Sequence, residues 1–205
     1  MRKSLAFLAA VATATVVVAG ATAAKPAVTI SASRPTVVYG GSVALSGKVS
    51  TNAAGESVQV MADAYPATTF SALSPISTTA GGNWTDTVTP TVQTSYQAHW
   101  KGATSRTVTV KVRPMISLTL VSLANGTFST KVTAARPFTG KFVNVQRLTS
   151  FGAVTMKKVK LDSSSSATFH VRLHPGRNRL RVVMPTAQAA PGYVIGTSKV
   201  LRVTK

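Results

Sequence analysis

The sequence predicts an all-β fold, because short stretches after residue 24 alternate between apolar and polar side chains. A two-residue period is typical of a half-buried strand. The stretch "SVALSGKVS" (42–50) puts Val43, Leu45 and Val49 on one face, and "RTVTVKV" (106–112) alternates in the same way. Val, Thr and Ser dominate these stretches, Gly, Pro and Asn separate them, and no segment after residue 24 has a convincing helical period.

The chain also repeats itself, which predicts a tandem duplication. Four pairs of segments match in the same order: 46–50 with 129–133, 58–62 with 143–147, 84–88 with 169–173, and 104–110 with 197–203. The offset between partners is nearly constant for the first three pairs and larger for the last. The second copy therefore carries extra residues, which we place in a loop, "MPTAQAAPGY" (184–193).

Each copy has the size and number of strands of an immunoglobulin-like β-sandwich, about 85–90 residues and about seven strands. We predict two such domains in tandem, residues 25–113 and 114–205, with Pro114 stiffening the joint. Aromatic residues in strands usually lie in a core. The candidates are Trp84 and Trp100 in the first domain and Phe128, Phe142 and Phe169 in the second.

The first 24 residues, "MRKSLAFLAAVATATVVVAGATAA", are predicted to be a helical signal peptide. They have a basic start, an apolar run and then small residues, with Ala21 and Ala23 fitting the cleavage pattern and cleavage expected after Ala23 or Ala24. The apolar run is short for a membrane span of about 20 residues. We therefore expect a secreted protein without a stable membrane span in its mature form, free or held non-covalently to the cell envelope.

The residue types present argue against catalysis, and no metal and no cofactor are predicted. The chain has no cysteine, which excludes disulfides, thiolate metal sites and thiol nucleophiles. His170 and His174 are four apart, which in a strand separates them by about 13 Å. Of only four acids, Asp63 and Asp86 are the pair that a carbohydrate-active function at the cell wall would need side by side.

Positive charge is the strongest functional signal. Lys and Arg number 23 against 4 Asp and Glu, a net charge of +19, which favours anionic partners. Residues 114–205 hold 14 of the bases and one acid. Their bases cluster at Lys157, Lys158 and Lys160 and at Arg177, Arg179 and Arg181. Alternation puts the three arginines on one face of a strand, with Leu180 and Val182 towards the core.

Two interpretations of these six residues remain open. Outward basic residues solvate a strand and deter edge-to-edge aggregation, and they need no ligand to do so. Alternatively, the six form a site for a phosphate- or carboxylate-bearing polymer, for which the arginine fork is suited. An exported protein meets wall and surface polymers first, so we expect a cell-wall polymer or a surface protein as partner rather than nucleic acid.

Three parts of the chain resemble secreted bacterial repeat proteins with immunoglobulin-like domains, especially those of actinobacteria: "VVYGGSVALSGKVS" (37–50), "GGNWTDTVTPTVQTSYQAHWKGATSRTVTVKV" (81–112), and "RNRLRVVMP" (177–185) with "PGYVIGTSKVLRV" (191–203). The resemblance implies a β-sandwich, secretion, and a role in adhesion, spacing or envelope association. It supplies no catalytic residue. We expect a secreted, non-catalytic structural or interaction module. The alternatives are an accessory or inhibitor of carbohydrate-active enzymes at the wall, and an extracellular nucleic-acid binder.

Overall fold

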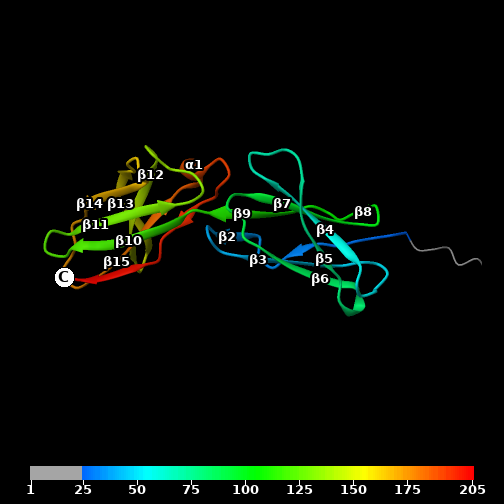
Figure 1. Ribbon diagram of the computed structural model, residues 1–205. Coiled ribbons are helices and arrows are strands. Elements are labelled where there is room, and N and C mark those ends of the chain that lie inside the picture. Colours follow the sequence, from blue (N-terminus) through cyan, green and yellow to red (C-terminus); the bar gives the residue numbers. More distant parts are fainter. Residues whose placement is uncertain (1–24) are drawn as a thin grey trace, which may run out of the picture.

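Residues 25–205 are described by a computed structural model, and they form an all-β molecule (Figure 1). The predicted signal peptide, with its cleavage residues Ala21, Ala23 and Ala24, lies outside the described residues. Within 25–205, neither of the short helical turns approaches the length and apolar character needed to cross a bilayer. We call residues 25–113 the N-terminal half and residues 114–205 the C-terminal half.

The strands are short and follow one another closely. The N-terminal half contains β1 (Ser31–Ala32), β2 (Thr36–Val38), β3 (Val43–Lys48), β4 (Ser57–Ala64), β5 (Ser71–Ser77), β6 (Asn83–Val88), β7 (Thr94–Trp100), β8 (Ala103–Thr104) and β9 (Val108–Arg113). The C-terminal half contains β10 (Met115–Ser122), β11 (Thr127–Thr133), β12 (Phe142–Thr149), β13 (Gly152–Lys160), β14 (Ser166–His170), β15 (Arg177–Met184), β16 (Gly196–Thr197) and β17 (Leu201–Thr204). The helical turns are η1 (Ala80–Gly82) and α1 (Thr186–Ala189).

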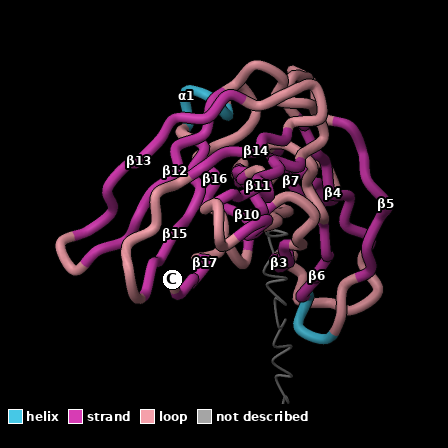
Figure 2. Tube along the Cα trace, turned by 90° about the vertical axis from the view of Figure 1, so that its left-hand side faces the viewer, coloured by secondary structure: helices cyan, strands magenta, loops and turns pink. Residues whose placement is uncertain are grey.

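Each half consists of two sheets. The N-terminal sheets have the orders β1-β3-β6 and β2-β9-β7-β4-β5, with β8 beside β7. The C-terminal sheets have the orders β10-β11-β14 and β13-β12-β15-β16, with β17 also beside β15. Figure 2 shows β13, β12 and β15 running side by side. The pairings are antiparallel except for β2 with β9, which is parallel.

The core lies between the two sheets of each half and follows the predicted alternation. In β7 every second residue is buried, from Thr94 to Trp100. Trp84, Phe128 and Phe169 are buried as predicted. Phe142 is only half-buried, so its assignment to the core was wrong. It points to the outer face of its sheet, and Phe138, which precedes β12, fills the core instead.

The two halves have the same strand order except for β2, which is present only in the N-terminal half, and a pair of buried serines occurs at corresponding positions. The Ala98 N–H donates to Ser105 Oγ at 2.8 Å, and Ser105 Oγ donates to the Arg106 carbonyl. In the C-terminal half the Val182 N–H donates to Ser198 Oγ at 2.9 Å, and Ser198 Oγ donates to the Lys199 carbonyl. Each hydroxyl thus connects the segment that enters the last strand of its half to a central strand of the same sheet. Ser105 connects the segment before β9 to β7, and Ser198 connects the segment before β17 to β15.

We expect Ser105→Ala and Ser198→Ala each to lower the free energy of unfolding by about 1–3 kcal/mol. Each change leaves a buried backbone N–H without its acceptor. Chemical denaturation followed by circular dichroism measures the loss. Ser95→Ala is the control, because its hydroxyl pairs only with Thr109 Oγ1 at a partly exposed site and should cost less than about 0.5 kcal/mol. Equal losses for Ser95 and Ser105 would contradict this account.

The extra residues of the C-terminal half, 184–193, make contact with the N-terminal half. The segment contains α1, which the prediction of a plain loop missed. Tyr193 Oη donates to the Thr91 carbonyl at 2.8 Å, and the Gln93 N–H donates to the Gly192 carbonyl at 3.0 Å. The joint around Pro114 is therefore reinforced by a loop that is distant from it in sequence.

Candidate anion-binding face

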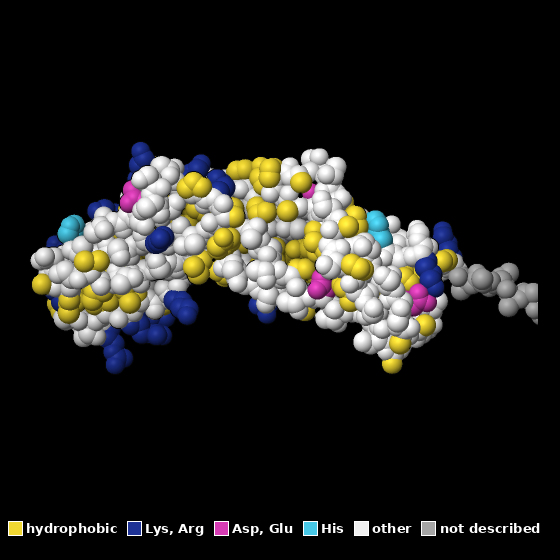
Figure 3. Space-filling model, viewed as in Figure 1, with side chains coloured by type: hydrophobic (Ala, Val, Ile, Leu, Met, Phe, Trp, Pro, Cys, Tyr) yellow, Lys and Arg dark blue, Asp and Glu magenta, His cyan; other side chains and the backbone are white. Residues whose placement is uncertain are grey.

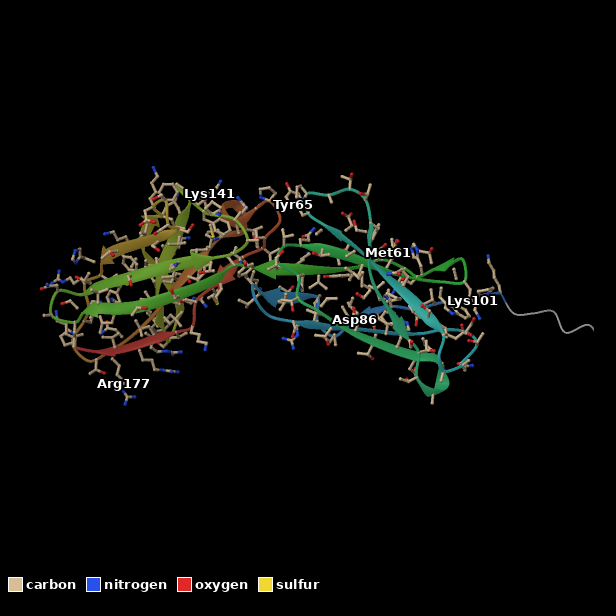
Figure 4. The ribbon with its side chains drawn as sticks, viewed as in Figure 1. Met61, Tyr65, Asp86, Lys101, Lys141 and Arg177 are labelled. Carbon is tan, nitrogen blue, oxygen red and sulfur yellow. The ribbon has the colours of Figure 1, made fainter. Side chains whose placement is uncertain are left out.

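The predicted arginine row is positioned by a turn and a strand. Asn178, which is buried, fixes the turn: its side-chain amide donates to the carbonyls of His174 and Gly176, and its Oδ1 accepts the His174 N–H. Strand β15 then alternates, with Asn178, Leu180 and Val182 buried. Arg177 and Arg179 are therefore exposed on the outer face, where Arg177 projects away from the ribbon (Figure 4).

The strand register brings most of the two predicted clusters onto one face. In β-sheets, directly opposite residues project to the same side. Lys158 lies opposite Asn144, which in turn lies opposite Val183 on β15, two residues from Arg181. Lys160 lies opposite Phe142 on the same side. The basic face is thus formed by Lys158 and Lys160 of β13, Arg177, Arg179 and Arg181 of β15, and Arg202 of β17.

Two details of the basic face differ from the sequence-based cluster. Lys157 lies opposite the buried Val145, so it projects to the other side of β13 and does not join the others. Arg202 lies opposite Arg179 and does join them. Arg202 was not among the residues predicted for this cluster, although the alternation of "LRVTK" (201–205) indicates its outward direction.

The contacts of the basic face leave most of its charge available. Arg181 Nε donates to Gln146 Oε1 at 2.8 Å, and Lys158 Nζ lies 4.5 Å from the centre of the Phe142 ring. Arg177, Arg179 and Arg202 line a groove of about 530 Å³ with Asn178, Val203 and Thr204. Figure 3 shows Lys and Arg side chains gathered along the lower side of the C-terminal half.

Acidic side chains do not neutralise this face. The one ion pair within residues 25–205 joins Lys101 to Glu56 in the N-terminal half, at 2.9 Å. Asp162, the single acid of the C-terminal half, accepts hydrogen bonds from the backbone N–H of Ser166 and from the hydroxyl and N–H of Ser164. These bonds, chiefly that from Ser166, hold the pKa of the Asp162 carboxyl below its ordinary value. Asp162 is therefore engaged within its own turn.

The residues considered for other chemistry are spread over different elements. Asp63 on β4 lies opposite Ser95, on the outer face of its sheet, whereas Asp86 on β6 of the other sheet lies opposite the buried Leu45. The two carboxylates therefore project from different faces, and the pair expected of a carbohydrate-active site is not assembled. His170 Nδ1 lies 3.0 Å from Thr127 Oγ1 on the neighbouring strand. Within the described part of the chain, no group of three His, Cys, Asp or Glu side chains could hold a metal ion.

The strand order shows the class of fold to which each half belongs. In each half a three-strand sheet packs on a larger sheet: β1, β3 and β6 pack on the sheet that contains β4, β7 and β9, and β10, β11 and β14 pack on the sheet that contains β12, β15 and β17. This arrangement is that of immunoglobulin-like β-sandwiches. No family model and no curated protein matches the sequence.

Two solved structures are similar at low identity. A tetra-tandem repeat from the extending region of a large adhesion protein matches with 13% identity and a TM-score of 0.36, over 87% of this chain and 49% of that one. Bovine butyrophilin matches with 13% identity and a TM-score of 0.39, over 89% of this chain and 99% of that one. This chain thus spans about half the length of the adhesion-protein structure. We base the class on the strand order.

Proposed function

We propose that this protein is a secreted, non-catalytic interaction module of two immunoglobulin-like domains, residues 25–113 and 114–205. The basic face of the second domain binds an anionic polymer of the cell envelope. The observation that carries this proposal is the gathering of six bases from β13, β15 and β17 on one outer face, with the single acid of the C-terminal half engaged in its own turn.

The spacing of the arginines in the row suits an extended, charged polymer. Residues two apart in a strand are separated by about 6.6 Å, so Arg177, Arg179 and Arg181 can meet successive charged groups of an extended polymer. Arg202 and Lys158 widen the row into a band across neighbouring strands. Guanidinium groups donate paired hydrogen bonds to phosphate or to carboxylate oxygens, and the attraction between the charges weakens as salt screens it.

Removing the arginine row tests the proposal. We expect the triple variant Arg177→Gln, Arg179→Gln, Arg181→Gln to bind purified bacterial cell walls about tenfold or more weakly, because each exposed ionic contact contributes up to about 1 kcal/mol. Sedimentation of the protein with walls, over a series of salt concentrations, measures the affinity. Circular dichroism establishes that the variant is folded, which we expect because Arg177 and Arg179 are exposed.

A matched variant separates this face from net charge. Lys48→Gln, Lys111→Gln, Arg113→Gln removes the same charge from exposed positions of the N-terminal half. It should retain wall binding within about twofold of the unmodified protein. Equal weakening of both variants would overturn the proposal, because binding would then follow net charge alone. Tighter binding to random-sequence duplex DNA than to walls at physiological salt would favour the nucleic-acid alternative.

A further inference from the structure

The C-terminal half also has an apolar groove, which is lined by other residues than the groove beside the arginine row. It lies between β10 and the segment that enters β17, and its volume is about 600 Å³. Its lining residues include Met115, Leu118, Val200 and Leu201, together with Val38 from the N-terminal half. Met115 and Val38 each expose 47% of their surface. Figure 3 shows hydrophobic side chains where β10 and β17 lie in Figure 1.

Two incompletely paired strands border this groove. Strand β10 has β11 as its one strand partner among the described residues, and β17 has β15. Each strand therefore has a second edge whose backbone groups have no strand to pair with. An unpaired edge beside an apolar groove is the arrangement that accepts an additional strand.

The N-terminal half shows how the equivalent edge is closed within this chain. There the chain leaves β1 at Ala32, crosses to the other sheet and forms β2, which runs parallel to β9. Val37 of β2 is buried, opposite Val112. In the C-terminal half the chain instead turns directly from β10 into β11, where the Gly126 N–H donates to the Leu123 carbonyl. The counterpart of β2 is thus missing beside β17, which corresponds to β9.

Charge indicates what kind of strand fits there. Lys199 lines the groove, Arg202 projects outward from β17, and the residues that line the groove include no acid. A net charge of +19 makes a second copy of this chain an unfavourable neighbour. A strand added beside β17 would put alternate side chains into the groove and the others towards these bases.

We propose that the groove binds an extended peptide segment of another protein by strand addition, running parallel to β17 as β2 runs parallel to β9. The peptide carries apolar residues such as valine or threonine at alternate positions, facing Met115 and Leu201. Acidic residues between them face Lys199 and Arg202. This partner is a protein and its site is the groove. Arg202 is the one residue of the basic face that the peptide would also contact, so the inference stands apart from polymer binding by the arginine row.

The probe is a labelled eight-residue peptide, Val-Glu-Val-Asp-Thr-Glu-Val-Asp, and fluorescence anisotropy measures its dissociation constant. We expect Met115→Asp to weaken binding about tenfold or more, because it removes a large apolar contact and adds a repelling charge. Val121→Asp is the matched control: it is on β10 and 60% exposed but does not line the groove. The affinity of the Val121→Asp variant for the peptide should remain within about twofold of that of the unmodified protein.

Two further measurements separate strand addition from loose adsorption. A peptide with proline in place of the central aspartate loses a backbone donor and should bind about tenfold or more weakly. Hydrogen exchange of the amides of β17 should slow when the peptide is bound. Equal affinity for Met115→Asp and Val121→Asp, equal affinity for the proline peptide, or unchanged exchange would each overturn the inference. The arginine-row triple variant should keep its peptide affinity within about threefold, which distinguishes failure at this groove from failure at the basic face.

Discussion

Trp84→Ala is expected to lower the free energy of unfolding of the N-terminal half by about 3–5 kcal/mol, because it empties a large volume in a packed core. Trp84 is 2% exposed and lies opposite Gly47 on β3. A side chain at Gly47 would bring a Cβ within 2.7 Å of Trp84 Cε2 and closer still to the Thr29 carbonyl. The indole therefore occupies space that the neighbouring strand leaves open for it.

Differential scanning calorimetry measures this loss, and Phe169→Ala is the matched variant. Phe169 holds the corresponding position in the duplicated sequence, is also buried, and packs against Phe128 with ring centres 6.1 Å apart. If residues 25–113 and 114–205 unfold as separate domains, each variant lowers the midpoint temperature of a different unfolding transition. A shift of one common transition by both variants would contradict the two-domain proposal. A loss below about 1 kcal/mol for Trp84→Ala would contradict the account of the core.

Arg136→Ala is expected to lower the free energy of unfolding of the C-terminal half by about 2–3 kcal/mol. It should also weaken the contact of residues 186–194 with the N-terminal half. One terminal nitrogen of Arg136 lies 2.7, 3.0 and 3.2 Å from the carbonyl oxygens of Ala189, Ala190 and Pro191. The guanidinium also lies 4.8 Å from the centre of the Phe138 ring. Hydrogen bonds from a charged group each contribute about 1.5–3 kcal/mol to the free energy of unfolding. The Nε of Arg136 is buried without a partner, and the free-energy cost of burying it offsets part of that gain.

The same arginine should also support the joint, because the loop that it holds ends at Tyr193. Tyr193 Oη accepts the Ala135 N–H and donates to the Thr91 carbonyl of the N-terminal half. Thermal unfolding gives the stability of Arg136→Ala, and hydrogen exchange of residues 186–194 reports on the loop. Arg136→Lys is the control and should recover only part of the loss, because lysine is shorter and its single nitrogen cannot lie over the Phe138 ring and reach the three carbonyls at once. Full recovery by lysine, or unchanged loop exchange, would show that the guanidinium is not what holds the joint.

Most of the strand architecture could be predicted because a strand's period is local. Alternation in residues 94–100 and 177–184 was enough to assign inward and outward side chains, and the burial of Tyr96, Leu180 and Val182 confirms it. The match between the two halves located the extra residues correctly at 184–193, where the structure has a loop that its counterpart lacks.

The candidate site was predicted only in part, because a face is made by strands that meet through pairing. Lys157 and Lys158 are adjacent in β13, so the two-residue period alone puts them on opposite sides of the sheet. The pairing of Lys158 with Asn144 decides which of the two lies on the same face as the arginines. Arg202, distant in sequence from both predicted clusters, joins them because β17 pairs with β15. Phe142 and Phe138 could not be distinguished as core residues without knowing which side of β12 is covered.

Local sequence was therefore sufficient for the all-β class, the duplication, the excess of positive charge and the outward direction of the arginine row. Each of these depends on residue type or on a two-residue period. Tertiary pairing was required for the shared basic face, the contact of residues 184–193 with the N-terminal half, and the open edge beside β17. Each of these depends on which segments become neighbours, and that is set by packing between residues far apart in the chain.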